Sequence, residues 1–467
     1  MTETSPPDRA DIAVLGAGAA GLFAAIFAAR TLRSAGSRAR VVAVDGAKTL
    51  GAKILVAGGG RCNVTHHAVD ASAYAGSSRN AIGKVLRRFD VPATIAFFAE
   101  RGVELKREET GKLFPVTNKA RDILDALLSA ARDAGVEIWN PWRVGALSLA
   151  PDDHADARTP APAFMLTRGA HLDPAPGPDA SAPADDSAHA EEPIAPPRLH
   201  AARIIIATGG MALPKSGSDG AGYAFVRALG HTTTPRIVPA LVPLILAESC
   251  FIRALSGITL PTTLRVVSGH GKRLVEFTNS TLCTHFGLSG PGPLDISRYY
   301  FAAKADDAAA RLEISWTPGS TVEQIDDLLL KSRHLTPAAA LARRPLALPE
   351  RLALALCTSV GLDPAASGEH LPRDRRRALA AAVAAMPVPV VGERGFTYAE
   401  VTAGGVPLSE IRLETMESRA RPGVHLCGEI CDVDGRIGGF NFQWAWASGF
   451  AAGIGAAEAT LSHAPSG

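Results

Sequence analysis

The chain has 467 residues, which suffices for two or three domains with sizeable apolar cores. With 47% hydrophobic residues, 20% charged residues and a formal net charge of +2, its composition is that of a globular protein. The overall charge therefore identifies no strongly charged partner, although it does not exclude a local basic patch. Six scattered cysteines form no paired C-x-x-C motifs, which argues against a disulfide framework and a metal site.

Nothing in the sequence indicates secretion or membrane insertion. The N-terminus lacks a basic start followed by an apolar segment, so we expect no signal peptide. The apolar stretch 12–29 is interrupted by glycine and alanine turn positions, which suits a strand–helix unit better than a membrane span. We therefore expect a cytoplasmic protein with reduced thiols. Cys427 and Cys431 are expected to be small buried residues rather than redox partners or metal ligands.

The stretch 11–30 organises the chain. An apolar run from Ile12 to Leu15 predicts a buried strand, Gly16, Gly18 and Gly21 form G-x-G-x-x-G, and an Ala-rich helix follows. In this motif the glycines allow a tight turn, close approach of a pyrophosphate and close helix packing. A second strand, rich in β-branched residues, ends at Asp45. In dinucleotide-binding folds a carboxylate at this position accepts a hydrogen bond from a ribose hydroxyl. Together these features predict dinucleotide binding.

A second glycine-rich segment, 51–67, follows. Gly58, Gly59 and Gly60 offer backbone N–H groups without side chains, which suits a flat ring or an anion. Polar residues surround them: Lys53, Arg61, Asn63 and Thr65. A mobile loop would explain the glycines but not this polar set.

The next segments predict a mostly regular fold. Residues 79–101 predict two short helices separated near Pro92, and Asn118 is expected to cap a helix that runs from 119 to Ala134 and stops at Gly135. Residues 151–200 are poor in large apolar side chains and predict a mostly disordered insertion, except for a strand at 164–167. A buried strand at 203–207 then leads to Thr208, Gly209 and Gly210, and a helix is expected from about 221 to 229.

Residues 236–316 alternate polar and apolar positions and predict an antiparallel sheet or small barrel. Within it, the segment 282–298 carries specialised residues around His285. This histidine is either a proton donor at an active cleft or a hydrogen-bonded packing residue.

Residues 321–391 predict helices. Between positions 331 and 377, the sequence contains nine Lys and Arg residues and four Asp and Glu residues, which gives a local charge of about +5. Such a run fits either a solvated helix face or a nucleic-acid contact. The candidate contacts to RNA or another substrate are Arg343, Arg344, Arg373, Arg375, Arg376 and Arg377.

The C-terminal part, 424–455, is dense in signals. A strand ends at Gly428 and Glu429, acidic residues follow at Asp432 and Asp434, and a glycine turn opens an Ala/Gly-rich helix. Carboxylates after a strand suit a chain of hydroxyls, and a helix N-terminus suits a flavin carbonyl.

The joint order of GAGAAG, GAKILVAGGGRCNVT, IIATGG with GSDGAGYAF, THFGLSGPGPL, AEVTAGGV and GEICDVDGRIGGFNFQWAWASG resembles the bacterial HI0933-like flavoprotein family, of aminoacetone oxidase and bile-acid reductase type. The resemblance covers nearly the whole chain except 151–200. It implies an α/β fold with a discontinuous Rossmann-type FAD-binding domain and inserted β-barrel and helical domains. The expected domains are 1–212 with 396–467, 213–320 with about 390–396, and 321–389.

The resemblance also implies the cofactor contacts. The glycine motif would hold the FAD pyrophosphate, Asp45 the adenosine ribose, and the segments after 58 and 432 the ring and ribityl chain. Asp45 departs from the more usual Glu of the family but preserves the carboxylate. The complete candidate set is Gly16, Gly18, Ala20, Gly21, Asp45, Lys53, Gly59, Gly60, Arg61, Asn63, Thr208, Gly209, Gly428, Glu429, Asp432, Gly438, Gly439 and Asn441.

The predicted activity is that of an FAD-dependent oxidoreductase. No second G-x-G-x-x-G occurs, so NAD(P)H is expected as a transient reductant in the substrate cleft. The resemblance implies reduction of a conjugated double bond, and one branch acts on a uridine of large-subunit ribosomal RNA. A small steroid-like enone or amine and a non-catalytic flavin-binding role are the alternatives. The candidate catalytic residues are His285 and Cys62.

Overall fold

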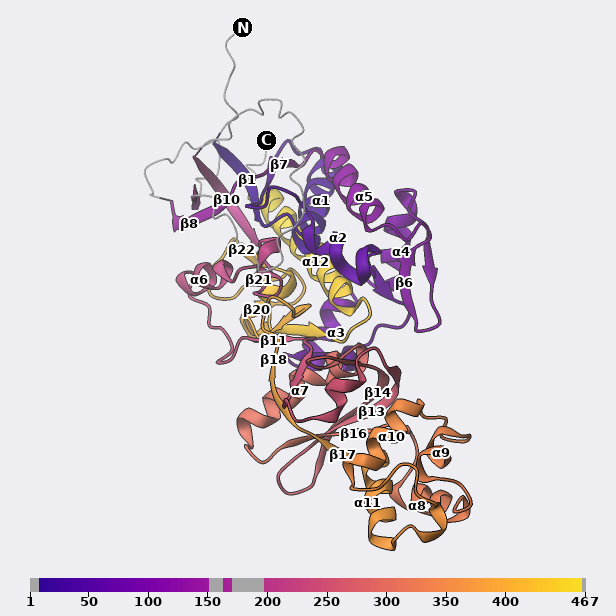
Figure 1. Ribbon diagram of the computed structural model, residues 1–467. Helices are drawn as coiled ribbons and strands as arrows, with labels where there is room; N and C mark the ends of the chain where they lie inside the picture. The colour runs from indigo at the N-terminus through magenta and orange to yellow at the C-terminus, as the bar shows by residue number, and fades with distance from the viewer. Residues whose placement is uncertain (1–7, 151–162, 170–196, 464–467) are drawn as a thin grey trace. The chain divides into compact units, whose positions relative to one another are not determined.

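The computed structural model describes residues 8–150, 163–169 and 197–463 (Figure 1). The chain divides into two compact units: unit 1 comprises Met1–Ile237 and Val401–Gly467, and unit 2 comprises Val238–Glu400. Each unit has its own apolar core. The predicted domain boundaries, including the one at residue 320 within unit 2, stay a prediction.

The centre of unit 1 is a sheet in the order β20-β21-β22-β10-β1-β2-β7, in which β22, β10, β1, β2 and β7 run parallel. In its middle, Leu15 of β1 is in register with Ile206 of β10 and Val44 of β2. This parallel order, with a helix between β1 and β2, confirms the Rossmann-type prediction. The strands of this path are β20 (Ile411–Arg412), β21 (Glu417–Ser418), β22 (Val424–Leu426), β10 (Arg198–Ile206), β1 (Arg9–Leu15), β2 (Val41–Val44) and β7 (Glu137–Trp139).

The long helices α1 (Ala19–Ser34) and α12 (Phe440–Ser462) lie side by side in unit 1 (Figure 1). Their backbones approach so closely that a Cβ at Gly449 would lie 2.5 Å from the Ala20 carbonyl oxygen, and one at Gly453 2.3 Å from that of Ala24. The small residues of both helices thus join the N-terminal and C-terminal parts of the chain. This contact makes the predicted discontinuous domain one folded body.

Several further elements of unit 1 match the sequence predictions. The two short helices expected in 79–101 are α3 (Arg79–Leu86) and α4 (Val91–Glu100), and the strand expected at 164–167 is β9 (Phe164–Arg168), which pairs with β8 (Val144–Leu149) and β10. The rest of the predicted disordered insertion lies largely outside the described residues. The remaining elements are α2 (Ala52–Gly60), β3 (Thr65–His66), β4 (Tyr74–Gly76), β5 (Leu105–Arg107), β6 (Lys112–Pro115), α6 (Ala221–Ala228), β19 (Val401–Ala403) and β23 (Val433–Gly435).

The predicted cap of helix α5 (Ala120–Ala134) is wrong. Lys119 occupies the N-cap position without a side-chain hydrogen bond, whereas Asn118 has a left-handed φ of +56°. The Asn118 N–H donates to the Pro115 carbonyl at 2.9 Å, so this residue closes the preceding turn instead. Gly135 ends the helix in a left-handed conformation, as predicted.

Unit 2 contains a seven-stranded antiparallel sheet in the order β17-β16-β13-β14-β15-β12-β18. Its two edge strands, β17 (Met386–Val388) and β18 (Val390–Glu393), are separated in the chain by Pro389 alone. The sheet therefore curls until its edges meet at one point, which is the form that the predicted barrel takes. The other strands of this sheet are β12 (Leu244–Leu246), β13 (Thr259–Val267), β14 (Arg273–Thr284), β15 (Gly287–Ser289) and β16 (Arg311–Ser315), whereas β11 (Val238–Ala240) lies outside it.

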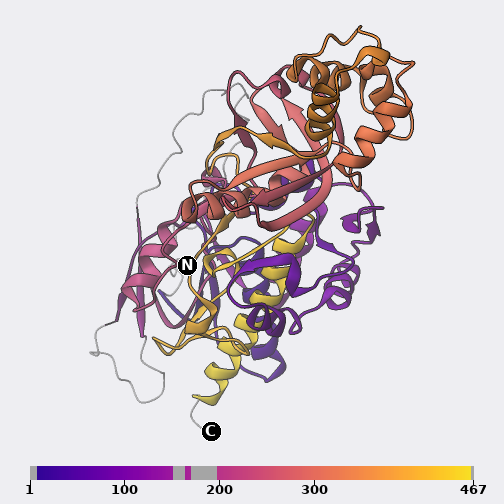
Figure 2. The same ribbon diagram turned by 90° about the horizontal axis from the view of Figure 1, so that it is seen from below.

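The helices of unit 2 share one apolar core with this sheet. Leu312 and Ile314 of β16 belong to the same buried cluster as Leu356 and Val383 from the helices. Figure 2 shows α8 to α11 gathered together beside the sheet. The helices are α7 (Pro291–Asp306), α8 (Val322–Lys331), α9 (Pro337–Ala342), α10 (Glu350–Ser359) and α11 (Arg373–Ala384), with a short 3-10 helix η3 (Phe251–Leu255).

Candidate functional site

The turn between β1 and α1 carries the three motif glycines. A Cβ at Gly16 would lie 2.6 Å from the Ala207 carbonyl oxygen, and one at Gly21 would lie 1.8 Å from the Gly16 carbonyl oxygen. Gly16 also has a φ of +97°, so the fold itself requires glycine there. Gly18 differs, because a Cβ there would meet nothing within 4 Å. The space beside Gly18 is therefore open.

The open space lies at the start of a long helix. Gly18 is the N-cap of α1, no side chain caps this end, and its first turn holds no acidic residue. Ala20, in that first turn, is nearly buried. The initial N–H groups and the positive end of the helix dipole attract an anion. This donor set fits the pyrophosphate of FAD.

Asp45, at the end of β2, faces the same turn. Its carboxylate oxygens accept hydrogen bonds from the N–H groups of Ala17, at 2.7 Å, and Ala47, at 2.8 Å. Burial raises the pKa of this carboxyl, while the two N–H donors oppose the shift. Each oxygen keeps acceptor capacity, so the residue fits a ribose hydroxyl.

Two predicted cofactor residues contact each other. The Lys53 Nζ lies 2.9 Å from a Glu429 carboxylate oxygen and 3.1 Å from the Ser218 hydroxyl. Both members of the ion pair are largely screened from solvent, with side-chain exposures of 27% and 19%. The pair thus ties α2 to the segment after β22.

Thr402 extends this network, and its place in AEVTAGGV is the one signal of it in the sequence. Its N–H donates to the other Glu429 oxygen at 2.8 Å, and its hydroxyl accepts from the N–H groups of Met211, at 2.7 Å, and Ala212, at 3.0 Å. Gly210 leaves the room for this contact, because a Cβ there would lie 2.4 Å from the Thr402 hydroxyl. Thr402 and Ser218 are the members of this polar network that sequence reasoning missed.

The glycines 58–60 have left-handed φ values of 59°, 69° and 84°. A Cβ at Gly59 would meet nothing within 4 Å, so its backbone borders open space. The Arg61 side chain makes contacts with protein groups instead: its guanidinium lies 2.6 Å from a Glu108 carboxylate oxygen and 4.0 Å from the centre of the Phe114 ring. These contacts assign Arg61 a structural role in the absence of a ligand.

Two predicted polar contacts retain unmet hydrogen-bonding capacity. Among the residues described, no partner is found for the buried side-chain oxygen of Asn63 or for the buried hydroxyl of Thr208. Buried polar atoms without partners are costly, so both fit a polar ligand. Gly209 follows Thr208 with a φ of +73°.

The C-terminal turn combines an acidic group with a helix start. Gly428 has a left-handed φ, Gly438 and Gly439 precede α12, and no side chain caps that helix at Gly439. Asp432 is nearly buried and accepts a long hydrogen bond of 3.4 Å from the Ser77 hydroxyl. Asn441 uses its side-chain oxygen and nitrogen on the backbone of Gly435, at 2.8 and 2.9 Å. The helix end fits a flavin carbonyl, whereas Asn441 shapes the turn.

The two candidate catalytic residues lie in different units. Cys62 is fully buried in unit 1, and burial raises the pKa of its thiol. Because burial favours the neutral thiol over the reactive thiolate, Cys62 is a poor nucleophile, which argues against nucleophilic catalysis by Cys62. His285 is exposed at the tip of the β14–β15 hairpin in unit 2, and its ring lies edge-on to Phe286 at 5.2 Å.

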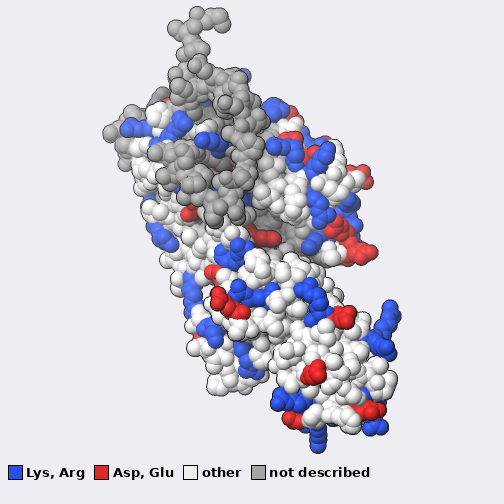
Figure 3. Space-filling model, viewed as in Figure 1, with Lys and Arg blue, Asp and Glu red and all other residues white. Residues whose placement is uncertain are grey.

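The predicted substrate arginines of unit 2 divide into two sets. Arg376 pairs with Asp326 at 2.8 Å, and Arg375 donates to the Val360 carbonyl at 2.6 Å. Arg343, Arg344 and Arg377 are exposed. On the face of unit 2 drawn in Figure 3, Lys and Arg side chains lie among Asp and Glu side chains. The run of basic residues is thus partly used by the fold.

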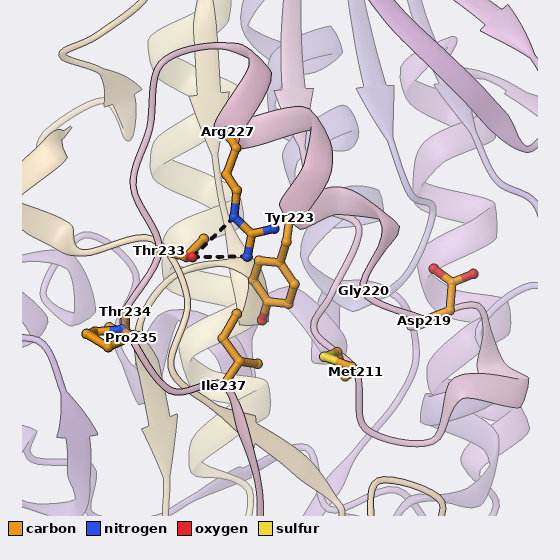
Figure 4. A pocket seen from close by; sticks show the side chains of 9 residues that line it. All are labelled: Met211, Asp219, Gly220, Tyr223, Arg227, Thr233, Thr234, Pro235 and Ile237. Carbon is orange, nitrogen blue, oxygen red and sulfur yellow. Dashed lines mark hydrogen bonds between the residues drawn. The ribbon is translucent and has the colours of Figure 1, made fainter.

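A cavity of about 500 Å³ opens in unit 1 beside α6 (Figure 4). Tyr223 is 3% exposed, and no partner is found for its hydroxyl among the described residues. The Arg227 guanidinium donates to the Thr233 hydroxyl, at 3.1 Å for the shorter bond. The cavity therefore combines polar donors with apolar wall. Its lining residues are Met211, Asp219, Gly220, Tyr223, Arg227, Thr233, Thr234, Pro235 and Ile237.

The described part of the chain holds neither a metal-binding cluster nor a helix long and apolar enough to span a membrane. Residues 8–150, 163–169 and 197–463 contain no group of three or more His, Cys, Asp or Glu arranged to hold a metal ion. Within the same part of the chain, every helix is too short or too polar to span a membrane. All six cysteines are free.

Several proteins of curated function are similar to this chain. A 3-dehydro-bile acid delta(4,6)-reductase of Clostridium scindens is 31% identical over 448 residues, which cover 96% of this chain and 99% of the relative. Ribosomal RNA dihydrouridine synthases are 30% identical in Escherichia coli, with 95% of this chain and 97% of the relative covered, and 28% identical in Haemophilus influenzae, with 94% and 97% covered. Among solved structures, a 3-ketosteroid delta1-dehydrogenase from Sterolibacterium denitrificans has a TM-score of 0.48 at 14% identity, covering 97% of this chain and 100% of its own.

A family model described as the HI0933-like protein Rossmann domain matches residues 10–168 and 185–455. This match spans most of the chain, and the relatives at 30% and 31% identity span nearly all of it. The predicted resemblance is therefore confirmed. The chain belongs to the HI0933-like family of FAD-dependent oxidoreductases.

Proposed function

We propose that this protein is an NAD(P)H-driven reductase of a carbon–carbon double bond conjugated with a carbonyl group, and that its substrate is a uridine of large-subunit ribosomal RNA. The observation that carries the proposal is the shared chemistry of the two kinds of relative. A 3-dehydro delta(4,6) steroid and a uracil ring both contain such a double bond. The product of the second reaction is dihydrouridine.

The residues of unit 1 supply a site for FAD. The N-terminus of α1 beside Gly18 would bind the pyrophosphate, Asp45 the adenosine ribose, and the turn at Gly438 and Gly439 the ring carbonyls. The unpartnered oxygens of Asn63 and Thr208 would gain hydrogen bonds. When bound, FAD supplies the hydride that the reduction requires.

The protein must also supply a proton. Reduction adds a hydride to the carbon β to the carbonyl and a proton to the α carbon, so a donor at the α carbon completes the product. We assign this donation to His285, whose imidazole is exposed at a hairpin tip and carries no side-chain hydrogen bond among the described residues. NAD(P)H, as the external reductant, balances the two electrons.

The cations of unit 2 favour RNA over a small substrate. Arg343, Arg344, Arg373 and Arg377 are exposed, and an RNA substrate needs such groups to neutralise phosphates. A small enone would leave them unused. Two of the relatives reported above act on ribosomal RNA, which agrees with this preference.

The proposal is tested with purified protein reconstituted with FAD. We expect NADH or NADPH to bleach the flavin absorption, and unmodified large-subunit ribosomal RNA to restore it with formation of dihydrouridine, measured by mass spectrometry. Bleaching without any product on RNA would contradict the RNA substrate. Absence of bleaching by either nucleotide, with or without substrate, would instead support a non-catalytic flavin-binding role.

A small conjugated enone is the second candidate, and the cavity of unit 1 favours it. Its volume of about 500 Å³ suits a compact molecule, Met211 and Ile237 offer apolar wall, and the Arg227 guanidinium offers a donor to a carbonyl oxygen. A 3-keto-4-ene steroid would reoxidise the bleached flavin if this candidate is correct. Substitution Arg227→Met would then raise KM for the enone.

A further inference from the structure

We propose that unit 2 binds an unpaired RNA segment along a surface stripe of cationic and aromatic side chains, which deepens the function proposed above and rests on it. Of the residues in this stripe, only Arg351 belongs to the run of basic residues between positions 331 and 377. We call it the basic–aromatic stripe, and its members are Arg253, His285, Phe286, Arg351, Arg394 and Tyr398.

One end of the stripe is a stack of planar groups. The Arg394 guanidinium carbon lies 3.5 Å from the centre of the Tyr398 ring and 4.6 Å from that of the Phe286 ring. One arginine thus orders two aromatic rings from different segments, the β14–β15 hairpin and the loop after β18. Because the contacts exist in the free protein, the rings need not be ordered on binding.

The hairpin tip connects this stack to further cations. His285 precedes Phe286, and its carbonyl oxygen accepts a hydrogen bond of 2.8 Å from the Arg253 side chain. Arg253 lies in η3, where the next carbonyl, that of Ala254, accepts 2.8 Å from Arg351 of α10. Contacts therefore link Tyr398 to α10 without a gap.

Three members of the stripe are exposed, whereas Arg253, Phe286 and Arg394 are half-buried, and its arginines keep their positive charge. Tyr398 is 45% exposed, and His285 and Arg351 are exposed as well. No ion pair is found for Arg253, Arg351 or Arg394 in the described part of the chain. Glu393, beside Arg394, directs its carboxylate to the Gly395 N–H instead. By contrast, the positive charge of Arg376 is neutralised by Asp326.

This combination has a specific partner chemistry. Aromatic rings and guanidinium planes stack on unpaired bases, and cations beside them bind the phosphates between those bases. A duplex hides its base faces, so it would use only the cations. The stripe therefore predicts a preference for single-stranded RNA, the form in which a uridine is accessible to a reductase.

The experiment measures binding of a fluorescent single-stranded oligouridylate to the FAD-loaded, full-length protein by anisotropy. We expect Tyr398→Ala and Arg394→Ala each to weaken binding roughly tenfold, as loss of a base stack does, and Tyr398→Phe to retain it. Arg394→Ala should also lower the slope of log affinity against log salt by about 0.7. A duplex of the same length should bind more weakly and be insensitive to Tyr398→Ala.

Arg273→Ala is the control, because it removes an exposed arginine of β14 in the same unit that pairs with Glu276 at 3.3 Å and lies outside the stripe, and it should leave affinity unchanged. Flavin content and thermal midpoint report correct folding of every variant. Stripe variants that bind RNA like the wild type, while the wild type still forms dihydrouridine, would overturn the stripe alone. A wild type that binds no oligouridylate, or binds oligoglutamate equally well, would overturn both the stripe and the RNA substrate.

Discussion

The glycine turn of unit 1 and the arginine-rich helices of unit 2 differ in how far a residue pattern determines its use. At the turn, Gly16 and Gly21 are fixed by backbone atoms within 2.6 Å of where a Cβ would be. On α11, Arg376 is committed to Asp326, whereas its neighbour Arg377 is exposed. A steric requirement for glycine can be predicted from the sequence motif. The role of an arginine depends instead on which side chains the fold places beside it.

The largest effect is expected where the fold requires glycine for steric reasons. Gly21→Ala should lower the free energy of unfolding by about 3 kcal/mol or more and abolish FAD retention, because the Gly16 carbonyl lies 1.8 Å from the new Cβ. Chemical denaturation and the ratio of flavin to protein absorbance measure both.

Gly18→Ala separates the cofactor role from the fold. Its Cβ meets no protein atom, so stability should change by less than about 1 kcal/mol while FAD affinity falls. Gly83→Ala, inside α3 with no atom closer than 3.5 Å to its Cβ, is the control: it should leave FAD affinity unchanged and raise stability by up to about 1 kcal/mol, because alanine favours a helix more than glycine. Equal destabilisation by Gly18→Ala and Gly21→Ala would contradict the division between them.

A buried histidine gives unit 1 a dependence on pH. Burial lowers the pKa of His425 to about 4, below its unfolded value of 6.5. The unfolded state therefore binds more protons between these values, so stability is complete above about pH 6.5 and falls as pH drops, by about 3 kcal/mol near pH 4. His425→Gln should flatten the profile measured by urea unfolding; an unchanged slope would show that other groups cause it.

The ion pair of Lys53 and Glu429 tests the polar network of the site. Lys53→Met should cost about 2 kcal/mol, because it leaves a largely screened carboxylate with one charged partner fewer. In a double-mutant cycle, Glu429→Gln should cost less in the Lys53→Met background than alone. Additive effects would mean that the two side chains act independently.

The smallest effect is expected from the adjacent arginines of α11. It tests whether the role of an arginine depends on its partner in the fold. Arg376→Ala should lower stability by about 1 kcal/mol, since it breaks the pair with Asp326, whose pKa the Arg376 hydrogen bond holds below its usual value. Arg377→Ala should change stability by less than about 0.5 kcal/mol. Thermal unfolding compares the two, and identical shifts would contradict the division. A variant in which Arg376 and Arg377 are both replaced by Glu would not separate a loss of stability from a loss of RNA affinity.

Sequence reasoning reached the Rossmann order, the glycine turn and the antiparallel sheet, because periodicity and glycine spacing reflect local backbone geometry. It failed at the cap of α5, where Asn118 closes a turn, since several positions compete for one local role. It also missed Thr402, whose partners Glu429 and Met211 are far away in the chain. The basic–aromatic stripe could not be predicted from the sequence for the same reason: Arg394 and Phe286 are far apart in the chain and come into contact only in the folded unit.

The most direct test of the central claim is mass spectrometry of large-subunit ribosomal RNA from a strain that lacks this protein. We predict that one uridine, present as dihydrouridine in the parent strain, is unreduced in the deletion strain. The modification should return on expression of the wild type but not of a variant that loses FAD, such as Gly21→Ala. Dihydrouridine at the same level in the deletion strain would contradict the account.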